Sequence, residues 1–279
     1  MGITTKTLAK LAGFGPASIR RVHGVDFSGA LDSGKRTWIA TAEVRKGALE
    51  IKNCFPARDL ADSGRSPELC LDALCRFIEK ETAAVFGIDF PFGLPRQILG
   101  NRSWPSFVRS FSRRYQNPEA FRRACLDAGQ GRELRRATDW ESQSPFSPYN
   151  IRMYRQTYYG IARILAPLVR RRSACILPMQ DAIPRKPWVL EVCPATVLKL
   201  HGLYNMSYKK KTREDYRARE RILRRFEKLG ITYADAEKLR SIILANSGGD
   251  ALDSVIAAFG TFQALQKQVL YASEGYIYA

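Results

Sequence analysis

Five acidic residues stand in or beside short apolar segments, where a carboxylate is well placed to do chemistry. Asp26 ends the segment RRVHGVD and Asp89 ends VFGID, and both segments have the character of buried strands. Glu191 lies within VLEVCPA, while Asp250 and Asp253 open the segment DALDSVIAAFG. The last two acids are three residues apart, so they share one face if this segment is helical. If the four places meet, the acids need a cation, because uncompensated buried charge is costly.

The cation that this residue inventory favours is Mg²⁺ or Mn²⁺. The chain has only two histidines, His23 and His201, and its six cysteines show no CxxC spacing, which disfavours zinc and a disulfide framework. Carboxylate oxygens suit hard divalent cations. A pair of such ions about 3.5–4 Å apart suits phosphodiester hydrolysis, since one activates water and the other stabilises the leaving oxygen.

Each acid also has an ordinary structural interpretation. Asp250 follows two glycines and is a candidate helix N-cap, and Asp253 in the first turn is favoured by the helix dipole. Asp26 and Asp89 are candidate turn residues. Glu191 is a candidate partner for an arginine of the basic region.

The elements expected to position these acids form a mixed α/β sheet. Strands are predicted at 21–27, 36–44 and 48–54, joined by short hairpin-type links, and a helix is predicted from Pro67. Further strands are predicted at 83–90 and 187–193, on either side of an Arg-rich helical insertion at about 96–172. A basic helix and then a last helix from Asp250 follow. Residues 1–20 are predicted to form an N-terminal extension.

The net charge of +18 is unevenly distributed. Residues 96–186 carry 18 Arg and Lys against 6 Asp and Glu, and residues 199–228 carry 11 against 4. This predicts a polyanionic partner, nucleic acid first, with solvated helix faces as the ordinary alternative. No apolar run approaches the roughly 18 residues that span a bilayer, and the N-terminus lacks a signal-peptide core. We therefore expect a cytoplasmic protein.

Four motifs in this order carry a resemblance to a known family. HGVDFSGA with TWIATAEV, VFGIDFPFGLP, LEVCPATVL and GDALDSVIAAFGTF resemble the domain-of-unknown-function 429 family, predicted nucleases with a ribonuclease H-like fold. The resemblance covers roughly 21–95 and 186–270. It implies that 21–279 form one ribonuclease H-like domain carrying the Arg-rich insertion. The expected activity is metal-dependent hydrolysis of nucleic-acid phosphodiester bonds.

The resemblance extends to Holliday-junction resolvases of the same superfamily. Carried onto this chain, their pattern implies Asp26, Asp89, Asp250 and Asp253 as catalytic metal ligands, with Glu191 as a further ligand or a supporting acid. Ribonuclease H itself has a glutamate on its first helix. The nearest residues here, Glu68 and Asp72, match it poorly, which argues against specificity for RNA–DNA hybrids. Because resolvase-like nucleases often pair, a homodimer is among the expected assemblies.

Two other functions share these features. One is an actin-like or sugar-kinase-like phosphoryl-transfer enzyme, in which HGVDFSGALDSG would hold phosphate, although no second phosphate loop of the DxGxT type is present. The other is a nucleic-acid-binding protein on a catalytically inactive nuclease scaffold. Arginines interleave with the aromatics of 104–115, a mixture able to stack bases, although aromatics at helical spacing usually form a core face. The residues expected to bind nucleic acid are Arg109, Arg113, Arg114, Lys209, Lys210 and Lys211.

Overall fold

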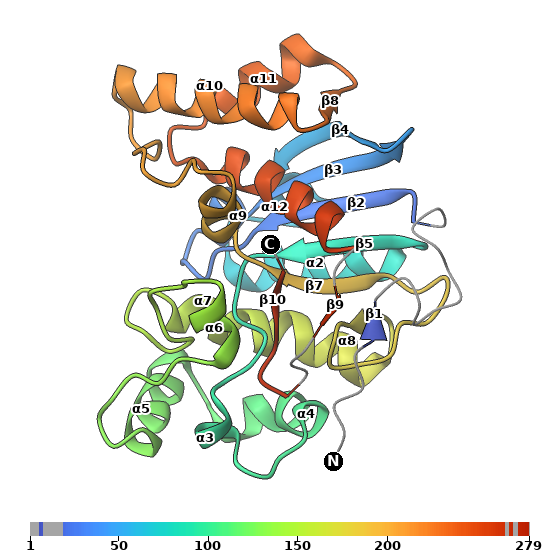
Figure 1. Cartoon of the computed structure of the whole chain (residues 1–279). Helices are drawn as coiled ribbons and strands as arrows, with labels where there is room; N and C mark the ends of the chain where they lie inside the picture. Colours follow the sequence, from blue (N-terminus) through green and yellow to red (C-terminus); the bar gives the residue numbers. More distant parts are fainter. Residues whose placement is uncertain (1–5, 8–18, 266–267, 270–272, 279) are drawn as a thin grey trace.

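A mixed eight-stranded sheet forms the centre of the molecule. The computed structural model describes residues 6–7, 19–265, 268–269 and 273–278. The strand order is β10-β7-β5-β2-β3-β4-β8, and β6 pairs with β7 outside this path (Figure 1). The strands are β2 (Arg21–Asp26), β3 (Trp38–Arg45), β4 (Ala48–Pro56), β5 (Ala84–Ile88), β6 (Cys175–Ile176), β7 (Trp188–Val192), β8 (Ile231–Tyr233) and β10 (Ile277–Tyr278).

The directions of the strands confirm a mixed α/β fold. β3 runs antiparallel to both β2 and β4, whereas β5 is parallel to β2 and β7 is parallel to β5. The five predicted strands all form, because each is a short apolar segment bounded by charged or Pro-containing links. The segment LDSGK was predicted to be a short hairpin link. It instead leads into a short helix, α1 (Ser33–Arg36). A separate pair, β1 (Lys6–Thr7) with β9 (Gln268–Val269), lies outside the main sheet; most of the predicted 1–20 extension lies outside the described residues.

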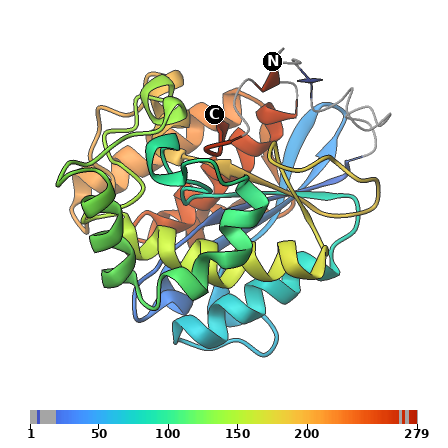
Figure 2. The ribbon, with the colours of Figure 1, turned by 90° about the horizontal axis from the view of Figure 1, so that it is seen from below.

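Helices cover both faces of the sheet and divide the core into two layers. Figure 2 shows the strands between α12 on one side and α2 with the η3–α8 segment on the other. One layer buries α9, α10, α11 and α12, and the other buries α2 and the helices of the insertion. The helices outside the insertion are α2 (Pro67–Lys80), α9 (Pro194–Leu200), α10 (Arg213–Lys228), α11 (Ala236–Ala245) and α12 (Asp250–Ala264), with the short η2 (Ala57–Asp59).

The Arg-rich insertion folds as a helical layer against the second face of the sheet. The long helical segment predicted at 151–172 is interrupted by one π-helical stretch, η3, just before Pro167. A proline cannot donate its backbone hydrogen bond, so a local change of helical pitch accommodates it. The elements of this layer are α3 (Arg96–Leu99), α4 (Trp104–Arg114), α5 (Pro118–Ala128), α6 (Ala137–Glu141), α7 (Tyr154–Tyr159), η3 (Gly160–Leu165) and α8 (Ala166–Arg171).

Within the described part of the chain, no single helix has both the length and the apolar character needed to cross a membrane. α11 and α12 meet that test only as a pair, which is bent by 120°. Most of α12 is buried in the core of the protein. This burial accounts for its apolar composition.

Two glycines allow α12 to lie directly on the sheet. A methyl group on Gly24 would overlap the backbone of Ser254 and Ala258, and one on Gly87 would overlap the side chain of Thr261. Gly24 and Gly87 are register partners on the neighbouring strands β2 and β5. The absence of a side chain at these two positions therefore lets α12 pack close to β2 and β5.

Gly24→Ala is expected to destabilise the protein by about 3 kcal/mol or more, because the new methyl group meets helix backbone that has no room to move. The measurement is the free energy of unfolding in urea. Gly47→Ala is the control, since its methyl group meets nothing within 4 Å and only the positive φ of 78° opposes it. That control is expected to cost about 1–2 kcal/mol. Equal losses in the two variants would contradict the role of Gly24 in seating α12.

Candidate functional site: an acid-floored cavity

The two strand-end acids point to the same face of the sheet. Side chains alternate along a strand, so Asp26 continues the face of Val22 and Gly24, which is the face that α12 covers. Asp89 follows β5 and continues the face of Val85 and Gly87 in the same way. Its backbone N–H donates to the carbonyl of Val25 at 3.0 Å, which fixes Asp89 beside the end of β2.

The first turn of α12 brings the other two acids to the same place. Gly249, at φ 82°, is the N-cap residue and has no side chain to cap the helix; Oδ1 of Asn246 accepts from the N–H of Ala251 at 3.3 Å in its place. Asp250 is therefore the first helical residue and not the predicted N-cap, which leaves its carboxylate free for other contacts. Asp253, one turn later, is buried.

Asp26, Asp89 and Asp250 line one cavity of about 360 Å³, and Asp253 is close enough to influence all three. Among the described residues, neither the Asp26 nor the Asp89 carboxylate has a hydrogen-bond or ion-pair partner. Their oxygens face the cavity. The structure thus brings together the four acids that the sequence singled out as metal ligands.

Burial and the nearby acids raise the pKa values of Asp26, Asp89 and Asp250. Burial, followed by the negative charge of Asp253, raises the pKa of Asp26 well above its usual range. The same two causes raise the pKa of Asp89 to about 7 and that of Asp250 to about 6. A cation close to these carboxyl groups would favour their ionised forms.

Lys209 supplies positive charge to this group of acids. Its ammonium lies 2.5 Å from Oδ2 of Asp253, although 54% of its side chain is exposed. The charge of Asp253 raises the pKa of Lys209, with further contributions from Asp26 and Asp89. The hydroxyl of Tyr208 donates to Oδ1 of Asp253 at 2.8 Å. Of the three lysines predicted to bind nucleic acid, Lys209 therefore contacts Asp253, and Lys210 and Lys211 are exposed.

The rim of the cavity is basic and aromatic. Arg36 and Lys199 line it together with the rings of Phe146 and Tyr204. Lys199 lies 4.7 Å from the centre of the Tyr204 ring and donates to the carbonyl of Gln143 at 2.6 Å. None of these four residues was singled out from the sequence. Lys199 directly follows the LEVCPATVL motif, and Arg36 lies a few residues after HGVDFSGA. Proximity to these motifs is the sequence feature that could have indicated Lys199 and Arg36 as site residues.

The Arg-rich insertion forms one wall of the cavity. Ser144, Pro145 and Phe146 line it from the loop after α6, and Met153 and Gln156 line it beside and within α7. The side-chain amide of Gln156 donates to the backbone carbonyl of Asp89. The insertion therefore shapes the site as well as adding charge.

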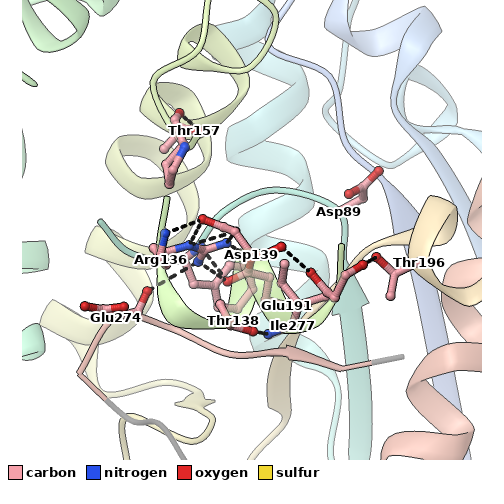
Figure 3. A network of polar contacts seen from close by, with 12 residues as sticks. Asp89, Arg136, Thr138, Asp139, Thr157, Glu191, Thr196, Glu274 and Ile277 are labelled. Carbon is pink, nitrogen blue, oxygen red and sulfur yellow. Dashed lines mark hydrogen bonds and ion pairs between the residues drawn. The ribbon is translucent and has the colours of Figure 1, made fainter. Parts of the chain in front are cut away.

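Glu191, predicted to belong to the catalytic acids, is engaged elsewhere. It pairs in register with Ile88, so it points to the sheet face opposite that of Asp89. Its Oε1 accepts from Arg136 at 2.6 Å, and its Oε2 accepts from Arg136 at 2.8 Å and from the N–H of Phe92 at 2.9 Å. Figure 3 shows Asp89 apart from this network. The alternative of pairing with an arginine of the basic region is the one observed.

Arg136 links the insertion to the sheet. Its guanidinium is fully buried and also binds Asp139 at 2.7 Å (Figure 3). Burial opposes the charge of Arg136, but Asp139 and Glu191 outweigh that effect and keep its pKa above the ordinary value. The three side chains form one ion network between α6 and β7.

None of the three arginines predicted on α4 lines the cavity. Arg109, Arg113 and Arg114 are exposed, but α4 and α10 occupy opposite ends of the molecule (Figure 1). The aromatic residues of 104–115 are buried in the core. This is the ordinary structural interpretation given above, in place of base stacking. The buried aromatics are Trp104, Phe107, Phe111 and Tyr115.

The cysteines do not provide a nucleophile at this site. All six are free thiols. Cys193 lines the cavity, but burial, with a smaller contribution from Asp89, raises its pKa to about 12. A thiol with this pKa stays protonated at neutral pH, and the reactive form is the thiolate.

The donor chemistry of the cavity fits a divalent cation. Four carboxylates offer only oxygen ligands, the preference of Mg²⁺ and Mn²⁺, and a cation beside them would favour the ionised forms of Asp26, Asp89 and Asp250, whose pKa values burial raises. As they stand, no three His, Cys, Asp or Glu side chains in the described ranges are spaced to hold one ion. Lys209 provides the positive charge instead, so binding of an ion there requires this side chain to move away from Asp253.

The raised pKa values predict how the stability of the metal-free protein depends on pH. For Asp89 and Asp250 the folded-state pKa lies above the unfolded value of about 4, so their favourable contribution is complete below about pH 4 and is lost by about pH 7. In EDTA, the melting temperature of Asp89→Asn is expected to rise relative to that of the wild type over this interval. Saturating Mn²⁺ is expected to remove the difference in slope. Parallel pH profiles in EDTA would contradict the predicted shift.

Comparison with known proteins gives one match. A family model described as "Protein of unknown function (DUF429)" matches residues 24–270, which include Asp26, Asp89, Asp250 and Asp253. Searches of curated proteins and of solved structures give no match.

Proposed function

The chain belongs to the DUF429 family, and from the geometry of its acid-floored cavity we propose that it is a metal-dependent nuclease with a ribonuclease H-like fold. The observation that carries the proposal is the meeting of Asp26, Asp89, Asp250 and Asp253 beneath a basic rim. An antiparallel β2–β3–β4 unit, followed by parallel β5 and β7 with acids at the ends of β2 and β5, supports the finer fold assignment.

The four aspartates would hold Mg²⁺ or Mn²⁺. Such an ion supplies positive charge to a phosphate and lowers the pKa of a water molecule. Tyr208 keeps Asp253 in place through its hydrogen bond to Oδ1. Burial, followed by the charge of Asp253, raises the pKa of Tyr208, so its hydroxyl stays protonated and continues to donate.

The rim supplies the groups that would bind the substrate. Arg36 and Lys199 provide cations at the mouth of the cavity, suited to phosphate oxygens. Tyr204, which is exposed, and Phe146, which is half-buried, provide ring surface on which bases can stack. Acids within the cavity and cations at its rim would orient a phosphodiester with its phosphorus toward the carboxylates.

Lys209 has a role of its own in this scheme. In the metal-free state it neutralises Asp253, and its mostly exposed side chain can rotate toward solvent without unpacking the core. Once released from Asp253, its ammonium lies at the mouth of the cavity, within reach of a bound phosphate. The same lysine would then serve the acids in one state and the substrate in the other.

The test is a cleavage panel. Labelled single-stranded and double-stranded DNA, the corresponding RNAs, an RNA–DNA hybrid and a four-way junction are incubated with Mg²⁺ or Mn²⁺, and parallel reactions contain EDTA. Cleavage that EDTA abolishes is the expected result. Salt-dependent binding of the same probes without cleavage would favour the inactive-scaffold alternative. ATP-dependent phosphorylation of a small molecule without cleavage would favour the kinase-like alternative.

A further inference from the structure

A second, larger cavity lies along the exposed face of α10. Its volume is about 560 Å³, and Leu203 is its one apolar lining residue. Five of the other lining residues are basic and one is acidic: Arg217, Arg221, Arg224, Arg225, Lys228 and Glu220. The concentration of positive charge separates this groove from an ordinary surface depression.

The helical register of α10 produces this arrangement. Residues 217, 221, 224 and 228 recur at spacings of three and four, so they share one face of the helix. The opposite face carries Ile222, Leu223 and Phe226, which are fully buried in the core. Packing of that apolar face therefore fixes the direction in which the basic face points.

Most of the positive charge in the groove is uncompensated. Arg224 pairs with Glu220 at 2.8 Å, and Arg221 contacts the sulfur of Met206. Within the part of the chain that the structure describes, Arg217, Arg225 and Lys228 have no acidic partner at ion-pair distance. Like charges held together on a rigid helix repel one another, and a polyanion would relieve that repulsion.

Consecutive residues of one chain segment line the groove and the acid-floored cavity. Leu203 lines the groove and the next residue, Tyr204, lines the cavity. Both belong to the connection between α9 and α10, which also carries Lys209. A nucleic-acid strand that follows this connection could reach both sites.

We propose that the α10 groove binds the phosphate backbone of the same nucleic-acid strand whose scissile phosphodiester lies in the acid-floored cavity. The inference rests on the proposed function. From Arg217 to Lys228 the helix rises roughly 16 Å, which is long enough to face several phosphates of one strand, since each adds about 3.4 Å of rise along a duplex axis. Four of the five cations are arginines, whose planar guanidinium matches phosphate oxygens in a bidentate fashion.

The assignment predicts contacts with the backbone and not with bases. The groove offers no exposed aromatic ring for stacking among its lining residues, so its contribution is expected to be independent of base sequence. The contribution of the groove to binding is also expected to depend on the length of the oligonucleotide. An oligonucleotide that only fills the acid-floored cavity would not reach α10.

The experiment compares two triple variants that each remove three positive charges. Arg217→Gln/Arg221→Gln/Arg225→Gln alters the groove and leaves the Arg224–Glu220 pair intact; Arg109→Gln/Arg113→Gln/Arg114→Gln alters α4 at the other end of the molecule. Both are made in the Asp26→Asn background, so that binding is measured without cleavage. Fluorescence anisotropy with DNA and RNA 20-mers and with 4-mers is recorded between about 50 and about 200 mM salt.

For 20-mers, the groove variant is expected to bind at least about tenfold more weakly. The slope of log K against log salt is expected to fall by about 2, since each lost phosphate contact removes about 0.7–0.9. The α4 variant and the 4-mers should show little change. Equal losses for the two variants, or an unchanged slope, would overturn the groove assignment. Cleavage by an otherwise wild-type protein carrying the groove substitutions, with KM unchanged, would overturn it too while leaving the nuclease proposal standing.

Discussion

Asp26→Asn is expected to reduce metal-dependent cleavage by about 100-fold or more while leaving the protein folded. Asp26 ends β2 at the centre of the acid group, and its pKa responds to Asp253, Asp89 and Asp250 together. Asparagine keeps the shape of the side chain but loses the negative charge that a divalent cation requires. Mn²⁺ affinity, measured by calorimetry, is expected to fall in parallel.

The same substitution is expected to raise the stability of the metal-free protein at neutral pH. Burial and the neighbouring acids make an ionised Asp26 unfavourable, and asparagine removes that cost. Lower activity combined with a higher melting temperature in EDTA would separate a functional effect from unfolding. The control is Asp72→Asn, which alters an exposed acid on α2. Wild-type cleavage by Asp26→Asn would refute the site.

Arg136→Met is expected to lower the free energy of unfolding by about 3–5 kcal/mol. The guanidinium is completely buried and contacts Asp139 and Glu191 through five hydrogen bonds, with Glu191 held on β7 and Asp139 on α6. Removing it leaves two carboxylates in the core without a counter-charge. Urea denaturation followed by circular dichroism provides the measurement.

Two further variants test this explanation. Arg135→Met changes the neighbouring arginine, which is half-buried and stacks 3.1 Å from the centre of the Trp140 ring, and is expected to cost about 1 kcal/mol. The triple variant Arg136→Met/Asp139→Asn/Glu191→Gln is expected to recover part of the lost stability, because it removes the unpaired charges. Similar losses for Arg135→Met and Arg136→Met would show that the buried network is not the cause.

The network also bears on the shape of the cavity. α6 leads directly into Ser144, Pro145 and Phe146, which form part of the cavity wall. Arg136 holds α6 against β7, so loosening it would displace this wall. Through Arg136, Glu191 holds the insertion against the sheet, on the opposite side of the sheet from the carboxylates that line the cavity.

The strand and helix framework could be read from the sequence because it depends on local patterns. Short apolar segments bounded by Pro, Gly or charged residues predicted β2, β3, β4, β5 and β7, and an apolar stripe after Pro67 predicted α2. The short strands β6, β8 and β10 were not predicted, since two or three residues carry no periodicity of their own. They form because a neighbouring strand supplies hydrogen-bond partners.

The sequence by itself determined which acids end strands and which open the last helix, since each of these is a local property. Only the tertiary structure decided which of them meet. The alternation of side chains places Asp26 and Asp89 on the α12 face, and the register between β5 and β7 turns Glu191 to the other face. Likewise, the sequence predicted that Lys209 binds nucleic acid. The path of the chain between α9 and α10 places its ammonium against Asp253. Register, helix seating and loop path depend on contacts between residues far apart in the chain, and no local pattern encodes them.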